Sequence, residues 1–342
     1  MKNELTFDEL ALIAGGHTAF QLLWSGIQLG LFDFLSRNPG KTKGEISKEI
    51  GLEPQPTRIL LVGLATLRLI EKEGDYYKNS AIVNQLLVSD NPENMINVLG
   101  WQHYIVYPGE MDFLESLQAN SNVGLRHFKG NEDNLYARLS HEPKLEKIFH
   151  NAMSSLSNSA NKLLASSVNF NDIHHLVDAG GGDGTNAITL AKANPDLKLT
   201  IFDAPSVCNR AKQNITKENL SDRVNTYPGN FFETDFPPNI DAILFGHMMT
   251  IWSPQKDTSL LRKAYEALPK GGKVIIFNMM ANDDDIGPMA TALGSPYFLS
   301  IATGEGMMYS WSDYEKFLAN AGFKKTQRTE LPRNHGVLIG IK

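Results

Sequence analysis

The chain has 342 residues, a length that favours about two globular domains. Apolar residues make up 42% and charged residues 20%, a composition that excludes a fibrous or largely disordered protein. The formal net charge of −6 disfavours a general nucleic-acid or anionic-membrane surface, because both require concentrated lysine and arginine. The single cysteine, Cys208, excludes an intrachain disulfide framework and a thiolate-rich metal site, which fits a cytoplasmic location, and neither an export signal nor a membrane span is expected.

The first half of the chain, residues 5–169, has the three- and four-residue apolar spacing of helices. The run Thr42–Gly51 predicts a short helix that opens with Thr42 and Glu45 in a capping-box spacing and closes at a glycine. A very apolar helix is expected over Thr57–Ile70, followed by two short strands within residues 71–78. Helix, turn, helix and wing together form a winged-helix pattern.

The second of these helices would read DNA in a winged-helix regulator, but its composition argues against that role. Two arginines, Arg58 and Arg68, accompany a larger apolar set that requires burial: Ile59, Leu60, Leu61, Val62, Leu64, Leu67 and Leu69. The preceding run Phe20–Phe32 is apolar almost all round, which is typical of a helix inside a subunit interface. A homodimer is therefore expected, and a ligand-responsive regulator is the disfavoured alternative.

From about Ile173 onward, short apolar runs alternate with helical patterns. Strands are expected at His174–Asp178, Lys198–Asp203, Val224–Pro228, Ala242–Gly246, Lys273–Asn278, Lys324–Glu330 and Val337–Ile341. Helices are expected between most of them, at Asn186–Ala193, Ser206–Glu218, Gln255–Leu268 and Ser312–Ala321. The alternation predicts a parallel sheet covered on both faces, and the last two strands, with no helix between them, are expected to form a hairpin.

The run Leu176–Asn186 contains four glycines where the first strand hands over to a helix. Glycines there let a ligand approach the backbone, and the helix N-terminus offers unpaired N–H groups. A phosphate-binding P-loop is excluded because no Gly-Lys-Ser/Thr follows. A dinucleotide fold stays open on this pattern alone, since Gly182-x-Gly184-x-x-Ala187 satisfies its loose form.

Two carboxylates favour a different ligand. Asp178, at the tip of the first strand, would repel a pyrophosphate but suit an ammonium group, and Asp203, at the end of the second strand, is placed to bind a ribose diol. After the third strand, Gly229-Asn-Phe-Phe232 offers an amide for an adenine edge and an aromatic ring for its face. A nucleoside joined to a cationic amino acid fits this set, and S-adenosylmethionine is such a molecule.

Several runs together resemble the small-molecule O-methyltransferase family that includes the caffeate and acetylserotonin enzymes and bacterial antibiotic-tailoring enzymes. The resemblance extends from about Ala11 to the C-terminus. It is carried by Val177-Asp-Ala-Gly-Gly-Gly-Asp-Gly184, Phe202-Asp-Ala-Pro205, Gly229-Asn-Phe-Phe232, Trp252, Leu268-Pro-Lys-Gly-Gly272 and Ala321-Gly-Phe323.

This resemblance implies an α-helical winged-helix dimerisation and lid domain over residues 1–165. It also implies a Rossmann-like, seven-stranded class I methyltransferase domain of the α/β class over residues 166–342. The expected S-adenosylmethionine contacts are Asp178, Gly180, Gly182, Asp203, Gly229, Asn230, Phe231 and His247. Asn230 stands where the family usually has Asp, and its amide oxygen can still accept from the adenine amine.

The chain departs from the family pattern at the expected catalytic base. The family has a His-Asp-Trp run whose His removes a substrate proton, whereas Gly246-His-Met-Met-Thr-Ile-Trp252 places Thr250 in that position. Threonine is no base near neutral pH, so His247, three residues earlier, is the candidate replacement. Glu305 is displaced from the position of the family's orienting Glu, and the usual catalytic dyad is therefore expected to be absent.

Methyl transfer from a sulfonium needs mainly positioning and desolvation when the acceptor is already nucleophilic. The expected acceptor pocket comprises His103, His150, Met153, Trp252 and Met308, and no paired-histidine metal site is expected. The sequence therefore predicts methyl transfer to a small aromatic or polyketide-like molecule, on oxygen by default. Carbon or nitrogen is the alternative acceptor, and non-methylating catalysis by the sulfonium charge is a further one.

Overall fold

The computed structural model describes residues 4–342. The chain packs as two compact units, one ending at His103 and the other running from Tyr104 to Lys342. The boundary expected between residues 165 and 166 lies inside the second unit, because the long helix α11 (Pro143–Ser167) packs against the sheet-covering helix α12 (Thr185–Ala193). The boundary expected from the sequence separates a dimerisation and lid domain from a methyltransferase domain by function, not by packing, and it stays a prediction.

The first unit is mostly helical, with a small antiparallel sheet of order β1-β3-β2. Its elements are α1 (Phe7–Ala14), α2 (Gly16–Gln28), α3 (Leu31–Arg37), β1 (Lys41–Thr42), α4 (Lys43–Ile50), α5 (Pro54–Thr66), β2 (Ile70–Glu73), β3 (Tyr76–Asn79), α6 (Ala81–Leu86) and α7 (Ile96–Trp101). Thr42 and Glu45 form the expected capping box at the start of α4, and Gly51 closes that helix in the left-handed region. The π-helical turn η1 (Gln102–Val106) follows α7.

Helix α5 differs from the expected helix at both ends. It begins at Pro54, whose fixed φ suits a first helical position, and it ends at Thr66 because Arg68 adopts a left-handed φ of 59°. Its buried side includes Leu60, Leu61 and Leu64, while Ile59 and Val62 are exposed. The helix is therefore buried along one stripe rather than all round.

The first helix of this unit exposes large apolar side chains. In α1, Phe7 and Ile13 are 83% and 69% exposed, and in α2 only Trp24 and Gly26 are buried. Among residues 4–342 no single helix is long and apolar enough to cross a membrane. Only the bent pair α1 and α2, with 68° between them, passes by length and composition together.

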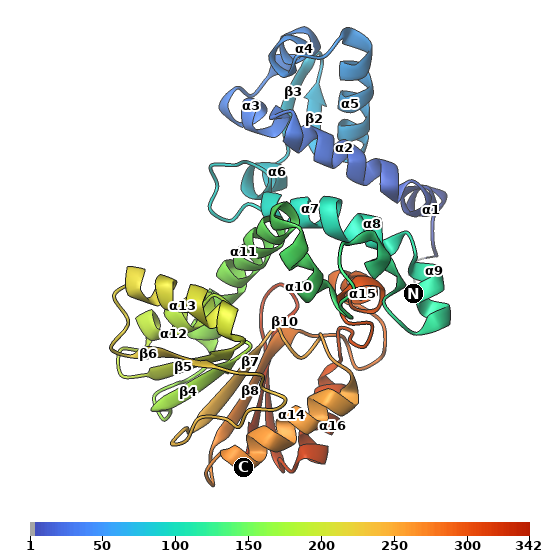
Figure 1. The fold of residues 1–342 in the computed structure, drawn as a ribbon. Coiled ribbons are helices and arrows are strands. Elements are labelled where there is room, and N and C mark those ends of the chain that lie inside the picture. Colours follow the sequence, from blue (N-terminus) through green and yellow to red (C-terminus); the bar gives the residue numbers. More distant parts are fainter. Residues whose placement is uncertain (1–3) are drawn as a thin grey trace. The chain divides into compact units, whose positions relative to one another are not determined.

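The second unit contains a seven-stranded sheet with helices on both faces (Figure 1). Before the sheet come α8 (Tyr107–Glu110), α9 (Phe113–Ala119), η2 (Val123–His127), α10 (Leu135–Arg138), η3 (Leu139–His141) and α11. The remaining elements are β4 (His175–Ala179), α12, β5 (Lys198–Asp203), α13 (Pro205–Lys217), β6 (Val224–Pro228), β7 (Ala242–Gly246), α14 (Pro254–Ala267), β8 (Lys273–Met279), α15 (Met289–Tyr297), η4 (Phe298–Ala302), α16 (Trp311–Ala321), β9 (Lys325–Glu330) and β10 (His335–Ile341).

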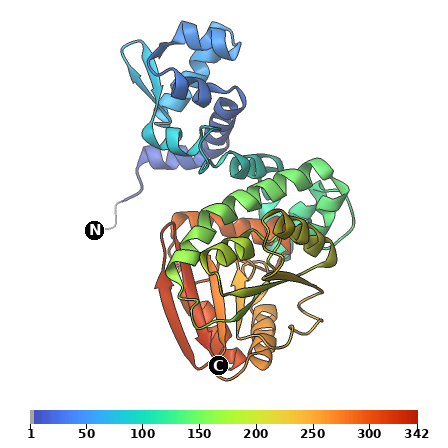
Figure 2. The same cartoon turned by 90° about the vertical axis from the view of Figure 1, so that its left-hand side faces the viewer.

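The strand order is β6-β5-β4-β7-β8-β10-β9. All neighbours are parallel except β10, which runs antiparallel to both β8 and β9 and completes the expected terminal hairpin. In the rotated view this hairpin forms one edge of the sheet, in red (Figure 2). The parallel sheet predicted from the strand–helix alternation is confirmed.

Alternate residues along each central strand enter two different cores. Ile243 and Phe245 of β7 pack with α14 and α16, whereas Ala242 and Leu244 pack with α11, α12 and α13. Strands buried on both faces read as continuous apolar runs, which is why the sequence predicts them well.

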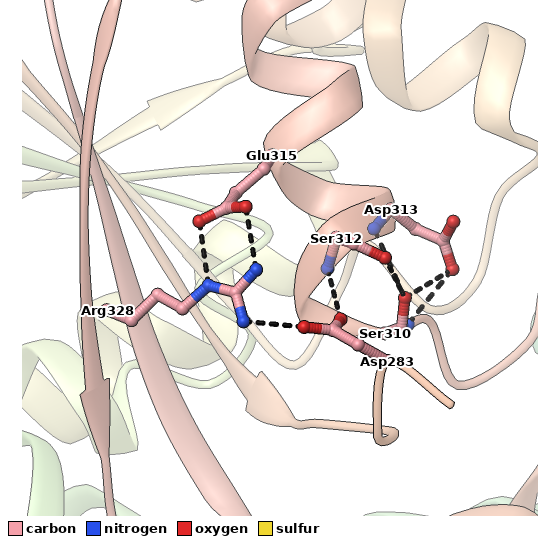
Figure 3. Close-up of polar contacts among 6 residues, drawn as sticks. All are labelled: Asp283, Ser310, Ser312, Asp313, Glu315 and Arg328. Atoms are coloured by element: carbon pink, nitrogen blue, oxygen red, sulfur yellow. Dashed lines mark hydrogen bonds and ion pairs between the residues drawn. The ribbon is translucent and has the colours of Figure 1, made fainter. Parts of the chain in front are cut away.

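The edge strand β9 is exposed along its whole length and is held by an ion-pair network (Figure 3). Arg328 donates through two nitrogens to both carboxylate oxygens of Glu315 on α16, each at 2.7 Å, and through its third nitrogen to Asp283 at 2.7 Å. Asp283 also accepts the backbone N–H of Ser312 in the first turn of α16 at 2.7 Å. Charged groups therefore tie the edge strand to α16 and blunt it against pairing with another chain.

The strand order reverses on either side of β4, since β5 and β6 lie to one side and β7 and β8 to the other. In open α/β sheets a crevice forms at such a reversal, beyond the carboxyl ends of the strands. The segments that follow β4, β5 and β7 are therefore expected to meet there, and they carry the glycine turn, Asp203 and His247.

Candidate cofactor and acceptor site

The glycine turn joins β4 to α12 through three left-handed residues. Gly180, Gly182 and Gly184 have φ values of 71°, 60° and 86°, a region that favours glycine. A Cβ on Gly184 would lie 3.0 Å from the side chain of Ile201, so this position also requires close approach to β5. Gly184 is the N-cap residue of α12, and the turn thus presents backbone N–H groups at a helix N-terminus.

Asp203 holds this turn from the end of β5. Its Oδ2 accepts the backbone N–H of Gly182 at 2.9 Å and its Oδ1 accepts that of Ala204 at 2.7 Å. Burial raises the pKa of the Asp203 carboxyl, and these two hydrogen bonds oppose the shift. The next strand end is attached to the same residue, because Gly229 N–H donates to the Asp203 backbone carbonyl at 2.9 Å.

Asp178 lies beneath the turn and is only 1% exposed. A Cβ on Gly181 would lie 2.8 Å from Asp178 Oδ2, so the turn folds closely over this carboxyl. Burial raises the pKa of Asp178 to about 7, the hydrogen bond from Asn186 Nδ2 at 3.3 Å lowers it, and the charge of Asp203 raises it further. The carboxyl is therefore enclosed beneath the backbone of the turn.

Beyond β6, Asn230 is exposed and its Oδ1 accepts the backbone N–H of Phe232 at 3.1 Å. Phe231 is half-buried and meets Phe202 edge to face, with ring centroids 6.3 Å apart. It also meets Trp252 edge to face at 6.4 Å. The structure therefore brings the loop after β6 into contact with the loop after β7.

Helix α11 lies beside the glycine turn. Ser154 Oγ donates to Asp183 Oδ2 at 3.2 Å, and Asp183 Oδ1 in turn accepts the Thr185 hydroxyl at 2.6 Å. His150 and Met153, both half-buried, precede Ser154 on the same helix. Burial is the main cause that lowers the pKa of His150. Two of the expected acceptor-pocket residues thus lie on a helix that contacts the turn directly.

His103 and Met308 have other surroundings. His103 ends the first unit, where its ring stacks on Trp24 with centroids 5.0 Å apart. Met308 lies before α16, its backbone N–H donates to Ser295 Oγ at 3.1 Å, and its methyl lies 3.0 Å from where a Cβ on Gly294 would be. Met308 therefore packs against α15, a helix that the sequence did not predict.

The ring of His247 points along the sheet toward β8 and β10. It lies 4.6 Å from the Phe277 ring and 5.2 Å from the His335 ring, centroid to centroid. Its backbone adopts a left-handed φ of 54°, and its N–H donates to the Phe277 carbonyl at 2.8 Å. Burial, with a smaller contribution from His335, lowers the pKa of His247 to about 3. The imidazole is therefore neutral and weakly basic.

Thr250 is buried, and its backbone is enclosed by the segment before α16. A Cβ on Gly306 would lie 2.1 Å from the Thr250 carbonyl oxygen, and Thr303 donates its hydroxyl to the Ile251 carbonyl. Trp252 packs edge to face on Phe232 at 5.0 Å, and its buried Nε1 has no hydrogen-bond partner among residues 4–342. The loop after β7 is thus firmly held while one ring nitrogen stays unpaired.

Asn186, Asp183 and Ser154 were not singled out from the sequence. The first two lie within the glycine-rich run, and a polar residue in the first turn after such a run is the available signal. Ser154 carries no local signal, because only the packing of α11 brings it to the turn. The hydrogen-bonded pair Tyr136 and Tyr297 is likewise tertiary, and burial raises the pKa of Tyr136 to about 12.

The site fits a cationic nucleoside ligand. Asp178 and Asp203 both have raised carboxyl pKa values and repel each other, and an ammonium or sulfonium group would relieve that repulsion. The buried Asn186 Oδ1, without a partner among the described residues, is a further unused acceptor. Across residues 4–342 no three His, Cys, Asp or Glu side chains gather where they could hold a metal ion.

Comparisons with known proteins identify the family of the chain. An O-methyltransferase domain model matches residues 118–324, and an O-methyltransferase dimerisation domain model matches residues 11–89. An L-tyrosine C(3)-methyltransferase of Streptomyces lavendulae is 40% identical, over 100% of this chain and 94% of that protein.

Solved structures show the same fold over nearly the whole chain. The S-adenosylmethionine-dependent methyltransferase SibL, solved in its apo form, is 35% identical with a TM-score of 0.89, covering 98% of this chain and 99% of that one. Human N-acetylserotonin methyltransferase, solved with S-adenosylmethionine, has a TM-score of 0.83 at 21% identity, covering 100% and 99%. The chain therefore belongs to the O-methyltransferase domain family and is an S-adenosylmethionine-dependent methyltransferase of the class I fold.

Proposed function

We propose that the chain transfers a methyl group to a ring carbon beside the phenolic hydroxyl of a small aromatic amino acid such as tyrosine. The observation that supports this is the 40% identity to a protein named as a tyrosine C-methyltransferase. The expectation that Thr250 stands in the position of the family's base agrees with it. The oxygen acceptor expected by default from the sequence becomes the second candidate, since the matching domain model is an O-methyltransferase model.

Oxygen and carbon acceptors differ in when the proton leaves. Methylation of a hydroxyl oxygen needs a base as the methyl arrives, because the neutral hydroxyl is a weak nucleophile. At a ring carbon, the carbon–carbon bond forms while the carbon–sulfur bond breaks, and the ring proton departs afterwards from a strongly acidic centre to water. Thr250 is no base, and the pKa of about 3 leaves His247 a poor one. Loss of the ring proton therefore needs no protein base. A phenol that arrives as its phenolate could react at either atom, so the choice of carbon is supported by the 40% identity to a protein named as a tyrosine C-methyltransferase.

The chain's residues take the following proposed roles. S-adenosylmethionine, when bound, would supply an electrophilic methyl group on a positive sulfonium. Asp203 would bind the ribose hydroxyls, the turn at Gly180 and Gly182 would receive the amino-acid end, and the field of Asp178 would favour its ammonium. The loop of Gly229, Asn230 and Phe231 would hold the adenine.

On the acceptor side, α11 and the loops after β7 would exclude water and hold the ring. His150, Met153, Trp252 and Met308, all in the second unit, are the proposed lining. Half-buried thioether and aromatic side chains suit a flat aromatic acceptor.

We also propose that the chain is a homodimer formed through a winged-helix-like first unit. The exposed apolar residues of α1 and the match to a dimerisation domain model over residues 11–89 support it.

The function is tested by incubating the protein with L-tyrosine and methyl-labelled S-adenosylmethionine and locating the label. A ring-methylated product retains a titratable phenol, whereas an O-methylated product does not, so a spectrophotometric pH titration of the product separates the two. The proposal expects label on the ring. Label on oxygen would establish the second candidate, and no transfer to any phenolic amino acid would overturn both.

A further inference from the structure

Asn186 lies in the first turn of α12, directly after the glycine turn. Its Nδ2 donates to Asp178 Oδ2 at 3.3 Å, and no other group within residues 4–342 donates a hydrogen bond to that carboxyl. The amide makes no second bond to the described part of the chain, because its buried Oδ1 has no partner. Within residues 4–342, this side chain therefore makes its hydrogen bond to Asp178 alone.

We propose that Asn186 is a positioning residue for cofactor binding, whose amide keeps the Asp178 carboxylate charged and oriented beneath the glycine turn. This inference rests on the proposed role of Asp178 toward the cationic amino-acid end of S-adenosylmethionine. Asn186 would thus act on the cofactor through Asp178.

The surroundings of Asp178 explain why its charged form depends on the Asn186 amide. The carboxyl is almost fully buried, and burial disfavours its charged form. A hydrogen bond donated to a carboxylate favours the charged form, and Asn186 supplies the one such bond. The amide nitrogen is also confined, since a Cβ on Gly246 would lie 3.4 Å from it.

No neighbouring group supplies a fixed positive charge that could replace this amide. Asp203 and Asp183 are acids, and burial lowers the pKa of both His150 and His247. On α13, the guanidinium of Arg210 faces Glu146 of α11 at 3.9 Å. The elements around Asp178 carry Asp183, Asp203, His150, His247, Glu146, Arg210 and the lysines of α11, α12 and α13. Among the described residues, only the charge of Asp203 shifts the pKa of Asp178.

The consequence is a pH dependence with a known direction. Cofactor affinity rises as Asp178 loses its proton, so the acid limb of the binding profile reports on this carboxyl. Without the amide donor, Asp178 loses its proton only at higher pH, and the acid limb moves upward. The alkaline limb reports on the cofactor's own ammonium and stays in place.

The test compares Asn186→Leu with the unmodified full-length protein by calorimetric titration of S-adenosylhomocysteine, which carries the same ammonium, from pH 5.5 to 9. We expect the acid limb to shift upward by about one pH unit and affinity at pH 7 to fall roughly 5- to 10-fold. Thr189→Val, on the same helix, removes a hydroxyl that bonds only to the helix backbone and should leave the profile unchanged.

Asp178→Asn separates this inference from the role on which it rests. In an Asp178→Asn background, Asn186→Leu should cause no further shift of the acid limb. Uniform weakening at every pH, or an unmoved acid limb in Asn186→Leu, would overturn the inference while leaving the cofactor site intact. Unchanged affinity in Asp178→Asn would overturn the role of Asp178 itself. Asn186→Ser is the second variant if the leucine variant does not fold.

Discussion

The carboxylate of Asp203 accepts the backbone N–H of Gly182 at 2.9 Å, so the residue proposed to bind ribose also fixes the shape of the glycine turn. One side chain at the end of β5 thus links two parts of the proposed cofactor site. A substitution there has two separable effects, on ligand contacts and on the turn.

Asp203→Asn should weaken S-adenosylmethionine binding by roughly 1–3 kcal/mol, because a charged acceptor for the ribose hydroxyls is lost. Its amide oxygen can still accept from Gly182, so the turn should persist. Asp203→Ala removes both contacts and should weaken binding further. Calorimetry measures both variants, with the exposed Asp196→Asn as the control. Unchanged affinity in Asp203→Ala would rule out the assigned role.

His247→Asn should change turnover by less than about threefold, because a neutral, weakly basic imidazole removes no proton at working pH. Asn tolerates the left-handed φ of 54°, so the variant isolates the ring from the backbone. Turnover against pH is the measurement. A loss of about 100-fold together with a vanished acid limb would instead identify His247 as the base. His335→Gln, which replaces the ring that meets His247 edge to face, is the matched control.

The double variant Phe7→Glu and Ile13→Glu should shift the protein from dimer to monomer in sedimentation experiments. Both side chains are largely exposed apolar groups of α1, and charges there would be buried unpaired in an interface. Tyr76→Glu, on the exposed face of β3, should leave the dimer intact. A double variant that stays dimeric would place the interface elsewhere.

The sequence predicts those parts of the fold that depend on local patterns. The β5, β6 and β7 bounds match the expected ones. For β5 and β7 the reason is that strands buried on both faces have continuous apolar runs bounded by turn residues. Helix α15 escaped prediction, since its glycine, its internal proline and its many small residues give no helical stripe. The end of α5 escaped as well, because a non-glycine left-handed residue such as Arg68 carries no sequence signal.

The candidate site likewise has a part that the sequence predicts and a part that it does not. Glycines 180, 182 and 184 and the carboxylates at strand tips follow from chain order, because parallel strands bring their carboxyl ends to one edge. Three other features depend on how helices pack on the sheet. They are the direction of the His247 ring, the contact of Ser154 with Asp183 and the hydrogen bond between Asn186 and Asp178. Side-chain direction at these positions is a tertiary property that residue spacing does not encode.

Asp257→Asn should stabilise the protein, and more so at pH 8 than at pH 5. Asp257 is 0% exposed, and neither carboxyl oxygen has a hydrogen-bond partner among residues 4–342. Burial, with a smaller contribution from the charge of Glu305, raises the pKa of Asp257 to about 9. The folded chain therefore holds this proton, while the unfolded chain releases it above about pH 4.

Stability consequently falls as pH rises from about 4 to about 9, because the folded state binds more protons than the unfolded state over that window. Near pH 8 the cost is on the order of 5 kcal/mol, and a neutral amide of the same size removes it. Denaturant unfolding at several pH values measures the difference, with Asp235→Asn, whose side chain is 98% exposed, as the control. Equal pH dependence in Asp257→Asn and the unmodified protein would show that Asp257 titrates normally and that a partner reaches it.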